Sequence, residues 1–301
     1  MAAIGYATRP AKHIQRQLVF DACRRLTAIA PLSNYSYVGF GGLEFVDFAL
    51  ARRQLGIHRM VSMERDAFAF ARYEFNRPFA EVEVMAGKAS ELLPTLDFSG
   101  LRIVWLDYEQ ALDEEVIADC MHLARVLQPG SMFVTTVNAA PATPRDRRRA
   151  DLVERVGESR IPTGTTDDSL AKWGMATAQR RILLDELTAA FRSRGDDAYL
   201  HQLINICYAD SVLMQTIGGL VVSPALVRPF ETCRFSDLDF IRQGDDHLIV
   251  RAPLLTPKEL IHLNRQLPRS TGQDFEVIGL GEEDATAYET FYRWYPSPPL
   301  L

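Results

Sequence analysis

The sequence has no hydrophobic run long enough to cross a membrane, although it extends over 301 residues. Its first nine residues, Met-Ala-Ala-Ile-Gly-Tyr-Ala-Thr-Arg, lack the apolar core of a secretory signal peptide. Cysteine is scarce as well, because only Cys23, Cys120, Cys207 and Cys233 are present and no two of them form a C-x-x-C pair. Each lies in an apolar pattern, which indicates a reduced core thiol. These absences favour a cytoplasmic protein.

Several catalytic motifs are missing too. No histidine follows the H-E-x-x-H spacing and no G-x-S-x-G segment occurs, which excludes zinc hydrolases and serine hydrolases of those types. Asp107 and Asn138 are candidates for a metal site, but a third ligand is not evident, so we expect no metal. A basic and aromatic stripe of the kind that binds single-stranded nucleic acid is also absent.

Charge is nearly balanced, since 39 acidic and 33 basic residues leave a net charge of −6. This argues against a general polyanion binder. Basic residues nevertheless gather at residues 9–25 and 145–149. Lys12 and Arg16 are one helical turn apart, and two cations at that spacing can hold a phosphate or a carboxylate. We expect them to bind an anionic ligand together with Arg9; the alternative is a solvated helix face.

Strand-like and helix-like segments alternate between residues 36 and 137. The expected strands cover residues 36–40, 59–63, 82–85, 101–106 and 131–137. The expected helices cover residues 43–55, 66–76, 89–93 and 113–127, and an amphipathic helix over residues 10–30 precedes them. Five β–α alternations predict an α/β protein with a parallel, doubly wound, Rossmann-like sheet.

The alternation stops after residue 139. Residues 145–194 are expected to be mostly helical, and residues 200–208 and 212–222 to form an antiparallel hairpin. A second hairpin is expected from residues 235–241 and 247–251. Thr256 predicts the capped start of a further helix that extends to residue 267.

The expected organisation has three parts. An N-terminal helix in residues 1–34 covers the cleft, and a Rossmann-like domain spans residues 35–225 with a helical insertion at 139–195. Residues 226–301 form a small α+β extension with an extended end at residues 295–299. The aromatic residues 291–295 either pack on the core or form a homodimer interface.

The most informative stretch lies between Tyr37 and Glu64. The strand Tyr37-Val-Gly-Phe-Gly-Gly42 ends in closely spaced glycines, a helix follows, and the next strand ends on Glu64, 22 residues beyond Gly42. Glycines allow the backbone to approach a ligand, and an acid at this place can bind a ribose diol. This order predicts a nucleotide-type cofactor, including NAD(P) as an alternative, although no G-x-G-x-x-G fingerprint is present.

The order of elements resembles the class I S-adenosylmethionine (SAM)-dependent methyltransferases, and within them the O-methyltransferases. The resemblance implies SAM as the cofactor, methionine binding at Gly39, Phe40, Gly41 and Gly42, and ribose binding at Glu64 beside Arg65. Met85-Ala-Gly-Lys-Ala-Ser-Glu-Leu-Leu-Pro94 resembles the adenine segment, which implies contacts from Lys88 and Ala89. The segments Arg102-Ile-Val-Trp-Leu-Asp-Tyr108 and Tyr208-Ala-Asp-Ser211 resemble the fourth strand and the closing hairpin.

The sequence departs from that family at two places. Aromatic Tyr35 and Tyr37 replace the usual acid before the first glycine, and Lys88 replaces the aspartate that accepts a bond from the adenine amine. Besides a methyltransferase with an anionic acceptor (a nucleotide, a nucleic acid or a phosphorylated or carboxylated small molecule), two alternatives remain open. One is a methyltransferase-like module that binds a nucleotide or partner without catalysis, and the other is an NAD(P)-dependent oxidoreductase.

The carboxyl ends of the parallel strands are expected to carry the chemistry. Asp107 and Tyr108 follow the buried fourth strand, and we expect both to face the acceptor, with Asp107 positioning or deprotonating it. Asn138 follows the fifth strand and is expected to contact the substrate with Arg9, Lys12 and Arg16. The alternative role of Asp107 is to cap the loop after the strand.

Overall fold

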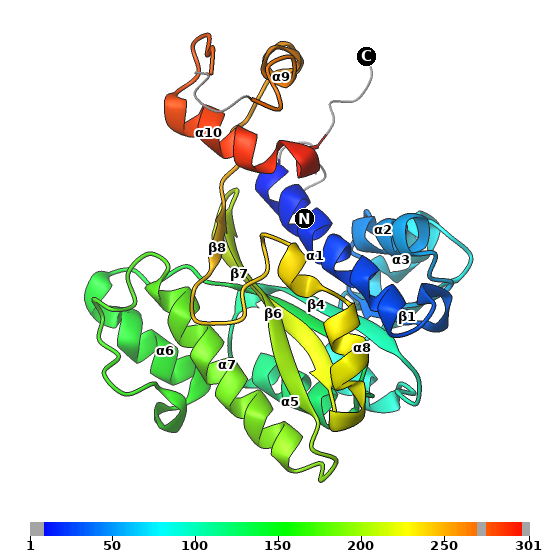
Figure 1. Cartoon of the computed structure of the whole chain (residues 1–301). Coiled ribbons are helices and arrows are strands. Elements are labelled where there is room, and N and C mark those ends of the chain that lie inside the picture. The colour runs from blue at the N-terminus through cyan, green and yellow to red at the C-terminus, as the bar shows by residue number, and fades with distance from the viewer. Residues whose placement is uncertain (1–8, 270–274, 297–301) are drawn as a thin grey trace.

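The chain folds around a single eight-stranded sheet, seen in a computed structural model that describes residues 9–269 and 275–296 (Figure 1). The strand order is β3-β2-β1-β4-β5-β7-β6-β8. Its strands are β1 (Ser36–Gly39), β2 (Arg59–Glu64), β3 (Val82–Ala86), β4 (Arg102–Ala111), β5 (Met132–Asn138), β6 (Tyr199–Ala209), β7 (Leu213–Val222) and β8 (Leu248–Val250). Strands β1 to β5 are parallel and β7 is antiparallel to both β5 and β6. The predicted doubly wound sheet with a closing antiparallel hairpin is therefore confirmed.

Helices cover both faces of the sheet (Figure 1). The helices are α1 (Pro10–Arg24), α2 (Val46–Leu55), α3 (Phe70–Asn76), α4 (Ala89–Leu92), α5 (Glu114–Val126), α6 (Arg148–Val156), α7 (Gly174–Arg192), α8 (Val227–Thr232), α9 (Pro257–Asn264) and α10 (Glu282–Phe291). Helices α1 and α2 pack on one face around Tyr37 and Trp105, while α5 and α7 pack on the other around Val104 and Leu106. The side chains of β4 alternate between the two cores, as a strand buried on both faces requires.

The closing hairpin depends on glycine at its centre. A Cβ atom on Gly219 would lie 2.1 Å from the carbonyl oxygen of His201, and one on Gly218 would lie 2.6 Å from that of Phe133. Both neighbours are backbone atoms and cannot rotate away. The two glycines therefore let β7 pair closely with β6 and β5.

The second predicted hairpin is wrong. Residues 235–237 form a short 3-10 helix, and β8 pairs instead with β6, in parallel, with Ile206 opposite Leu248. A three-residue strand gains more from joining the edge of a large sheet than from an isolated hairpin, which is marginal in water.

The C-terminal residues pack back onto the body of the protein. Thr256 caps α9 through its hydroxyl, which accepts from the Glu259 N–H, so the predicted helix start is confirmed. Trp294 donates to Asp21 on α1 at 2.6 Å and stacks edge-on against Phe240 at 6.0 Å. These aromatic contacts are intramolecular; a homodimer remains a prediction. Most of the predicted extended end, residues 297–299, lies outside the described residues.

Several predicted boundaries differ from the structure, among them the end of the helix predicted to reach residue 267, which stops at Asn264. The first helix ends at Arg24 and continues as a 3-10 turn, because the apolar face beyond it ends with Leu26. β4 continues to Ala111, well past the apolar run that marked it in the sequence. A β-bulge between Asp107 and Ala111 accompanies this extension, so the strand carries polar residues beyond the core.

Candidate functional site

The glycine turn and the acid of β2 meet at the carboxyl edge of the sheet. Glu64 Oε1 accepts from the backbone N–H groups of Gly41 at 2.8 Å and Gly42 at 3.1 Å. The Ser62 hydroxyl donates to the same oxygen at 2.6 Å. The predicted neighbourhood of turn and carboxylate is present, and Glu64 holds the turn in shape.

The positions in this turn require glycine for different reasons. A Cβ on Gly39 would lie 2.7 Å from the Trp105 carbonyl oxygen, and one on Gly41 would lie 2.4 Å from the Phe45 ring. These two positions are glycine because the protein's own chain is too close. Gly42 has a φ of +57° and no atom within 4 Å of an added Cβ, so it is the glycine with open space beside it.

The second oxygen of Glu64 is available for a ligand. Oε2 has no hydrogen-bond partner among the residues that the structure describes, although the side chain is largely buried. Burial raises the pKa of Glu64, and the bonds from Ser62, Gly41 and Gly42 oppose that rise. The three donors favour the ionised form, in which both oxygens accept hydrogen bonds. The carboxylate thus fits a ribose diol.

The predicted adenine side lies one strand further out. Gly87 has a φ of +149° and its N–H donates to the Glu64 carbonyl oxygen at 3.0 Å, so the end of β3 meets the end of β2. The ammonium of Lys88 lies 3.5 Å from Glu115 on α5, and both side chains are about half exposed. Ala89 is buried at the start of α4, and Arg65 is exposed. Lys88 is therefore drawn toward an acid of α5.

Asp107 and Tyr108 do not face a common acceptor, which corrects the prediction. Tyr108 points to the α5 side, where its hydroxyl donates to Asp119 at 2.6 Å and its ring packs edge-on against Phe40 at 5.1 Å. Asp107 points to the opposite face, under α1. Neighbouring residues of a strand lie on opposite sides, and this alternation separates them.

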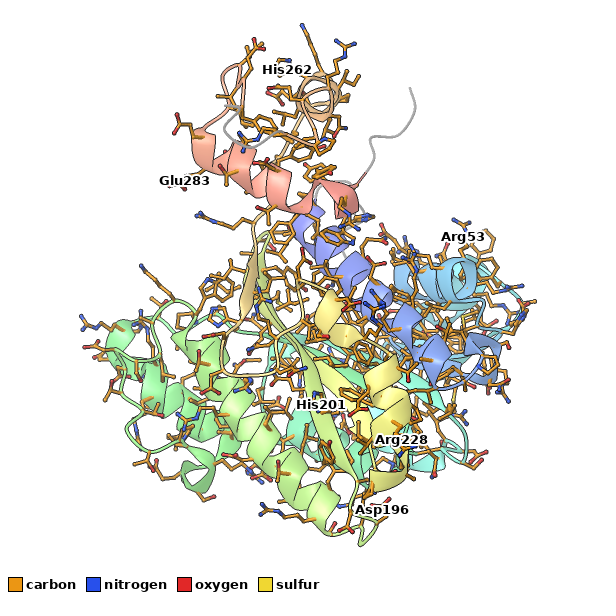
Figure 2. The ribbon with its side chains drawn as sticks, in the orientation of Figure 1. Arg53, Asp196, His201, Arg228, His262 and Glu283 are labelled. Carbon is orange, nitrogen blue, oxygen red and sulfur yellow. The ribbon has the colours of Figure 1, made fainter. Side chains whose placement is uncertain are left out.

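Asp107 belongs to a buried cluster of four charges. Its Oδ2 lies 2.9 Å from the Lys12 ammonium and 3.5 Å from Arg16, which also pairs with Asp47 at 2.5 Å. No side chain of the four is more than 11% exposed, unlike surface cations such as Arg53 on α2, which points outward (Figure 2). Burial raises the pKa of Asp47, and the Arg16 guanidinium works against it. Two cations and two carboxylates balance within the cluster.

The two cations expected at the cleft therefore lie beside Asp107, with their charges matched by acids. Neither lies on a solvated helix face, so that alternative is wrong for Lys12 and Arg16. Arg9 is half-buried just before α1, whose first N–H groups donate to Asp210 at the tip of the β6–β7 hairpin. Asn138 caps a turn by accepting from the Ala140 N–H at 2.8 Å.

Sequence reasoning missed Asp47, Asp210 and the hydroxyl of Tyr208. The Tyr208 hydroxyl is buried without a partner in the described part of the chain, and Asp107 raises its pKa further after burial. A signal for Asp47 was present, since an acid between Val46 and Phe48 on an apolar helix face must be paired when buried.

The described residues contain neither a metal-binding cluster nor a membrane-spanning helix. No group of three or more His, Cys, Asp or Glu side chains is placed to hold a metal ion. None of the described helices combines the length and apolar character needed to cross a membrane. The four cysteines are free and buried, and burial raises the pKa of Cys23 to about 12, as expected for core thiols.

Several solved structures are similar to this chain at low sequence identity. TomG, an O-methyltransferase from Streptomyces achromogenes solved in complex with SAM, is similar at 15% identity and a TM-score of 0.40, over 73% of this chain and 92% of that one. Human N-acetylserotonin methyltransferase in complex with SAM has 11% identity and a TM-score of 0.32, over 73% and 57%. A LepI variant in complex with SAH and a substrate analogue has 11% identity and a TM-score of 0.36; the match covers 62% of this chain but only 43% of LepI.

No curated protein matches the sequence significantly. A protein-family model described as "Putative O-methyltransferase" matches residues 4–297, nearly the whole chain. This match confirms the resemblance that the glycine turn, Glu64 and the closing hairpin indicated. The chain belongs to this O-methyltransferase family.

Proposed function

We propose that this protein transfers a methyl group from SAM to an oxygen atom of a small acceptor. The observation that carries the proposal is the free Oε2 of Glu64, held beside the Gly41 and Gly42 amides at the carboxyl edge of the sheet. Membership of the O-methyltransferase family supports it.

The residues present fit the cofactor. Glu64 Oε2 would accept the ribose hydroxyls, and Gly42 leaves room for the backbone to approach the ligand. We assign the methionine end to residues 39–42, and the adenine end to Lys88 and Ala89, next to Arg65. When bound, the sulfonium supplies an activated methyl group that an oxygen nucleophile can attack.

Asp107 is the proposed base. Its Oδ2 is occupied by Lys12 and Arg16, whereas Oδ1 has no hydrogen-bond partner among the described residues. The two cations fix the carboxylate in one orientation, which leaves Oδ1 able to accept a proton from the acceptor hydroxyl. Tyr108, bonded to Asp119 on the other face, is left out of this proposal.

The acceptor class is a further part of the proposal. We keep an anionic acceptor, recognised by cations of the same edge that have no ion pair among the described residues. These are Arg9, before α1, and Arg147, exposed after β5. Arg145, by contrast, is paired with Asp168, and the Arg148 guanidinium donates to the Asp167 carbonyl oxygen. Lys12 and Arg16 act indirectly, through Asp107.

Calorimetry with SAM, S-adenosylhomocysteine and NAD tests the proposal. We expect SAM and S-adenosylhomocysteine to bind and NAD not to bind. Glu64→Ala should weaken SAM binding by about 10- to 150-fold, equal to the 1.5–3 kcal/mol of hydrogen bonds to a charged group. Glu83→Ala, on an exposed site of β3, is the matched control and should change nothing. Binding of NAD alone would favour the oxidoreductase, and binding of SAM without turnover would favour a non-catalytic module.

A further inference from the structure

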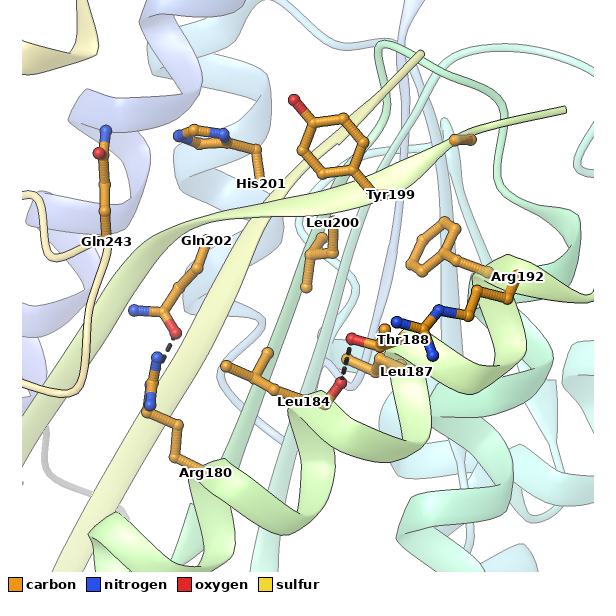
Figure 3. A pocket seen from close by; sticks show the side chains of 12 residues that line it. Arg180, Leu184, Leu187, Thr188, Arg192, Tyr199, Leu200, His201, Gln202 and Gln243 are labelled. Atoms are coloured by element: carbon orange, nitrogen blue, oxygen red, sulfur yellow. Dashed lines mark hydrogen bonds between the residues drawn. The ribbon is translucent and has the colours of Figure 1, made fainter.

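A cavity lies between α7 and β6, away from the glycine turn, with a volume of about 560 Å³ (Figure 3). Three strands, β4, β5 and β7, separate β6 from β1 and its glycine turn. Neighbouring strands are about 4.8 Å apart, so the cavity lies about 19 Å from that turn across the sheet. The proposed methyl transfer uses none of its residues.

The cavity exists because the outer edge of β6 is only partly covered. β8 pairs with Ile206–Tyr208 alone, and the backbone N–H of Arg242, in the loop before β8, donates to the Leu203 carbonyl oxygen. Residues 199–202 have no strand beside them on this side in the described part of the chain. Residues 242–245 lie across one end of the cavity, held by Gln202, whose amide donates to the Arg242 and Gly244 carbonyl oxygens.

The floor of the cavity is apolar. Leu184 and Leu187 project from α7, and Leu200 faces them from β6 (Figure 3). Phe191 of α7 also lines the cavity. Polar side chains, among them Arg180, Arg192 and Gln202, complete the lining. A volume of this size with an apolar floor and converging polar groups is typical of small-molecule sites.

One nearly buried cation stands at the end of this floor. Arg180 Nε donates to Gln202 at 2.7 Å, and Nη1 pairs with Asp245. The Arg180 side chain is 7% exposed and that of Asp245 is 76% exposed. Nη2 has no hydrogen-bond partner among the described residues and is not enclosed. Among the residues that the structure describes, the one carboxylate on this guanidinium therefore comes from an exposed loop.

We propose that this cavity binds a small amphiphilic carboxylate. Its head would take the place of Asp245 on Arg180, and its apolar body would lie on Leu184, Leu187 and Leu200. A guanidinium stays charged at all physiological pH values and binds a carboxylate through two parallel N–H bonds. Asp245 already shows that a carboxylate fits there, and its exposure lets it leave at little cost.

Calorimetry of the full chain with decanoate and decanol tests this inference in the absence of SAM, so its outcome is independent of methyl transfer. The two probes share a tail length, and only decanoate carries a charge. We expect decanoate to bind at least tenfold more tightly than decanol. Equal binding of the two would overturn the proposal.

Variants locate the binding. Arg180→Gln should weaken decanoate at least tenfold, while Arg181→Gln, an exposed cation one residue along α7, should leave it unchanged. Asp245→Asn removes the competing carboxylate and should tighten decanoate binding severalfold, a gain that a merely structural ion pair does not predict. Thr188→Trp, at an exposed wall of the cavity, should abolish binding of both probes.

Asp245→Asn and Thr188→Trp test the proposed carboxylate site even if Arg180→Gln fails to fold. Unchanged decanoate affinity in Asp245→Asn, or full binding in Thr188→Trp, would show that the carboxylate binds elsewhere and would overturn the inference.

Discussion

Asp47 and Asp107 both pair with Arg16, but only Asp107 is proposed to contact the methyl acceptor. Asp47 is buried, whereas Asp107, next to the β-bulge of β4, has one oxygen without a hydrogen-bond partner among the described residues. A buried cation with two acids is stable only while its charge is matched. At the scale of single residues, the cluster is therefore both a support for α1 and a device that orients Asp107.

Removal of Asp47 should expose the first role. Asp47→Ala leaves the Arg16 charge only partly compensated and should lower the free energy of unfolding by about 3–5 kcal/mol in urea titrations. Asp237→Ala breaks the exposed Arg234–Asp237 pair and should cost no more than about 1 kcal/mol. Similar losses in the two variants would mean that the buried cluster contributes no more than a surface pair.

The second role concerns turnover. Asp107→Asn keeps the shape of the side chain and removes its basicity, so methyl transfer to any acceptor that the wild type uses should fall about 10²-fold or more. Tyr108→Phe removes a hydroxyl on the opposite face and should retain most activity. The release of S-adenosylhomocysteine measures both variants. A larger loss of activity in Tyr108→Phe than in Asp107→Asn would show that our proposal assigns catalysis to the wrong face of the sheet.

Pairs of elements are held together by features that single residues do not reveal. α5 packs on β4 through the bond from Tyr108 to Asp119, and β7 fits between β5 and β6 through Gly218 and Gly219. In both cases the contact is short. Element packing should therefore respond to small changes at these points.

The contact between α5 and β4 should depend on pH. Burial raises the pKa of Asp119 from 3.8 to about 6, so the folded protein retains a proton that the unfolded chain has lost. Relative to Asp119→Asn, the wild-type protein is therefore most stable below about pH 4, and its relative stability declines as the pH rises to about 6. Above that pH the variant should be more stable by about 1–3 kcal/mol, at 1.36 kcal/mol per pKa unit. A stability difference that does not change between pH 4 and 7 would contradict this account.

The hairpin should not tolerate a methyl group at its centre. Gly219→Ala places a Cβ 2.1 Å from a backbone oxygen and should reduce the free energy of unfolding by about 1–3 kcal/mol or more. Gly244→Ala meets no atom within 4 Å and serves as the control in the same denaturation experiment. Equal stability of the two variants would show that β7 can shift away from β6.

The molecule as a whole places two sites on one sheet. The proposed cofactor site lies at β1 and β2, and the carboxylate cavity at β6. The C-terminal residues pack on α1 through Trp294 and Asp21, so the helix that covers Asp107 is itself held from outside. A ligand bound at the cofactor site should therefore change the stability of the whole chain.

Ligand binding should stabilise the entire fold. At a SAM concentration of 100 times Kd, the free energy of unfolding should rise by about 2.7 kcal/mol, because the unfolded chain does not bind. The same concentration should stabilise Glu64→Ala much less, since its Kd is higher. Thermal unfolding with and without SAM measures both. An equal Tm shift in the two proteins would remove Glu64 from the site.

Much of the fold was predictable from local patterns. Apolar periodicity located the five parallel strands, and Thr256 with Glu259 located the start of α9. Glycine spacing and the acid at the end of β2 identified the Glu64 site, because these features lie within one β–α–β unit. The opposite directions of Asp107 and Tyr108 were also available from strand alternation, and the sequence prediction overlooked them.

The sequence alone determined the order of the strands from β1 to β7 and the meeting of Gly41, Gly42 and Glu64, since both follow from short-range geometry. Only the tertiary structure decided that Arg16 pairs with Asp47 and Asp107, and that Arg180 meets Asp245 across 65 positions. The tertiary structure likewise decided that β8 pairs with β6. Charges and short strands far apart in the chain carry no periodic signal, and their partners depend on how the helices and loops pack around the sheet.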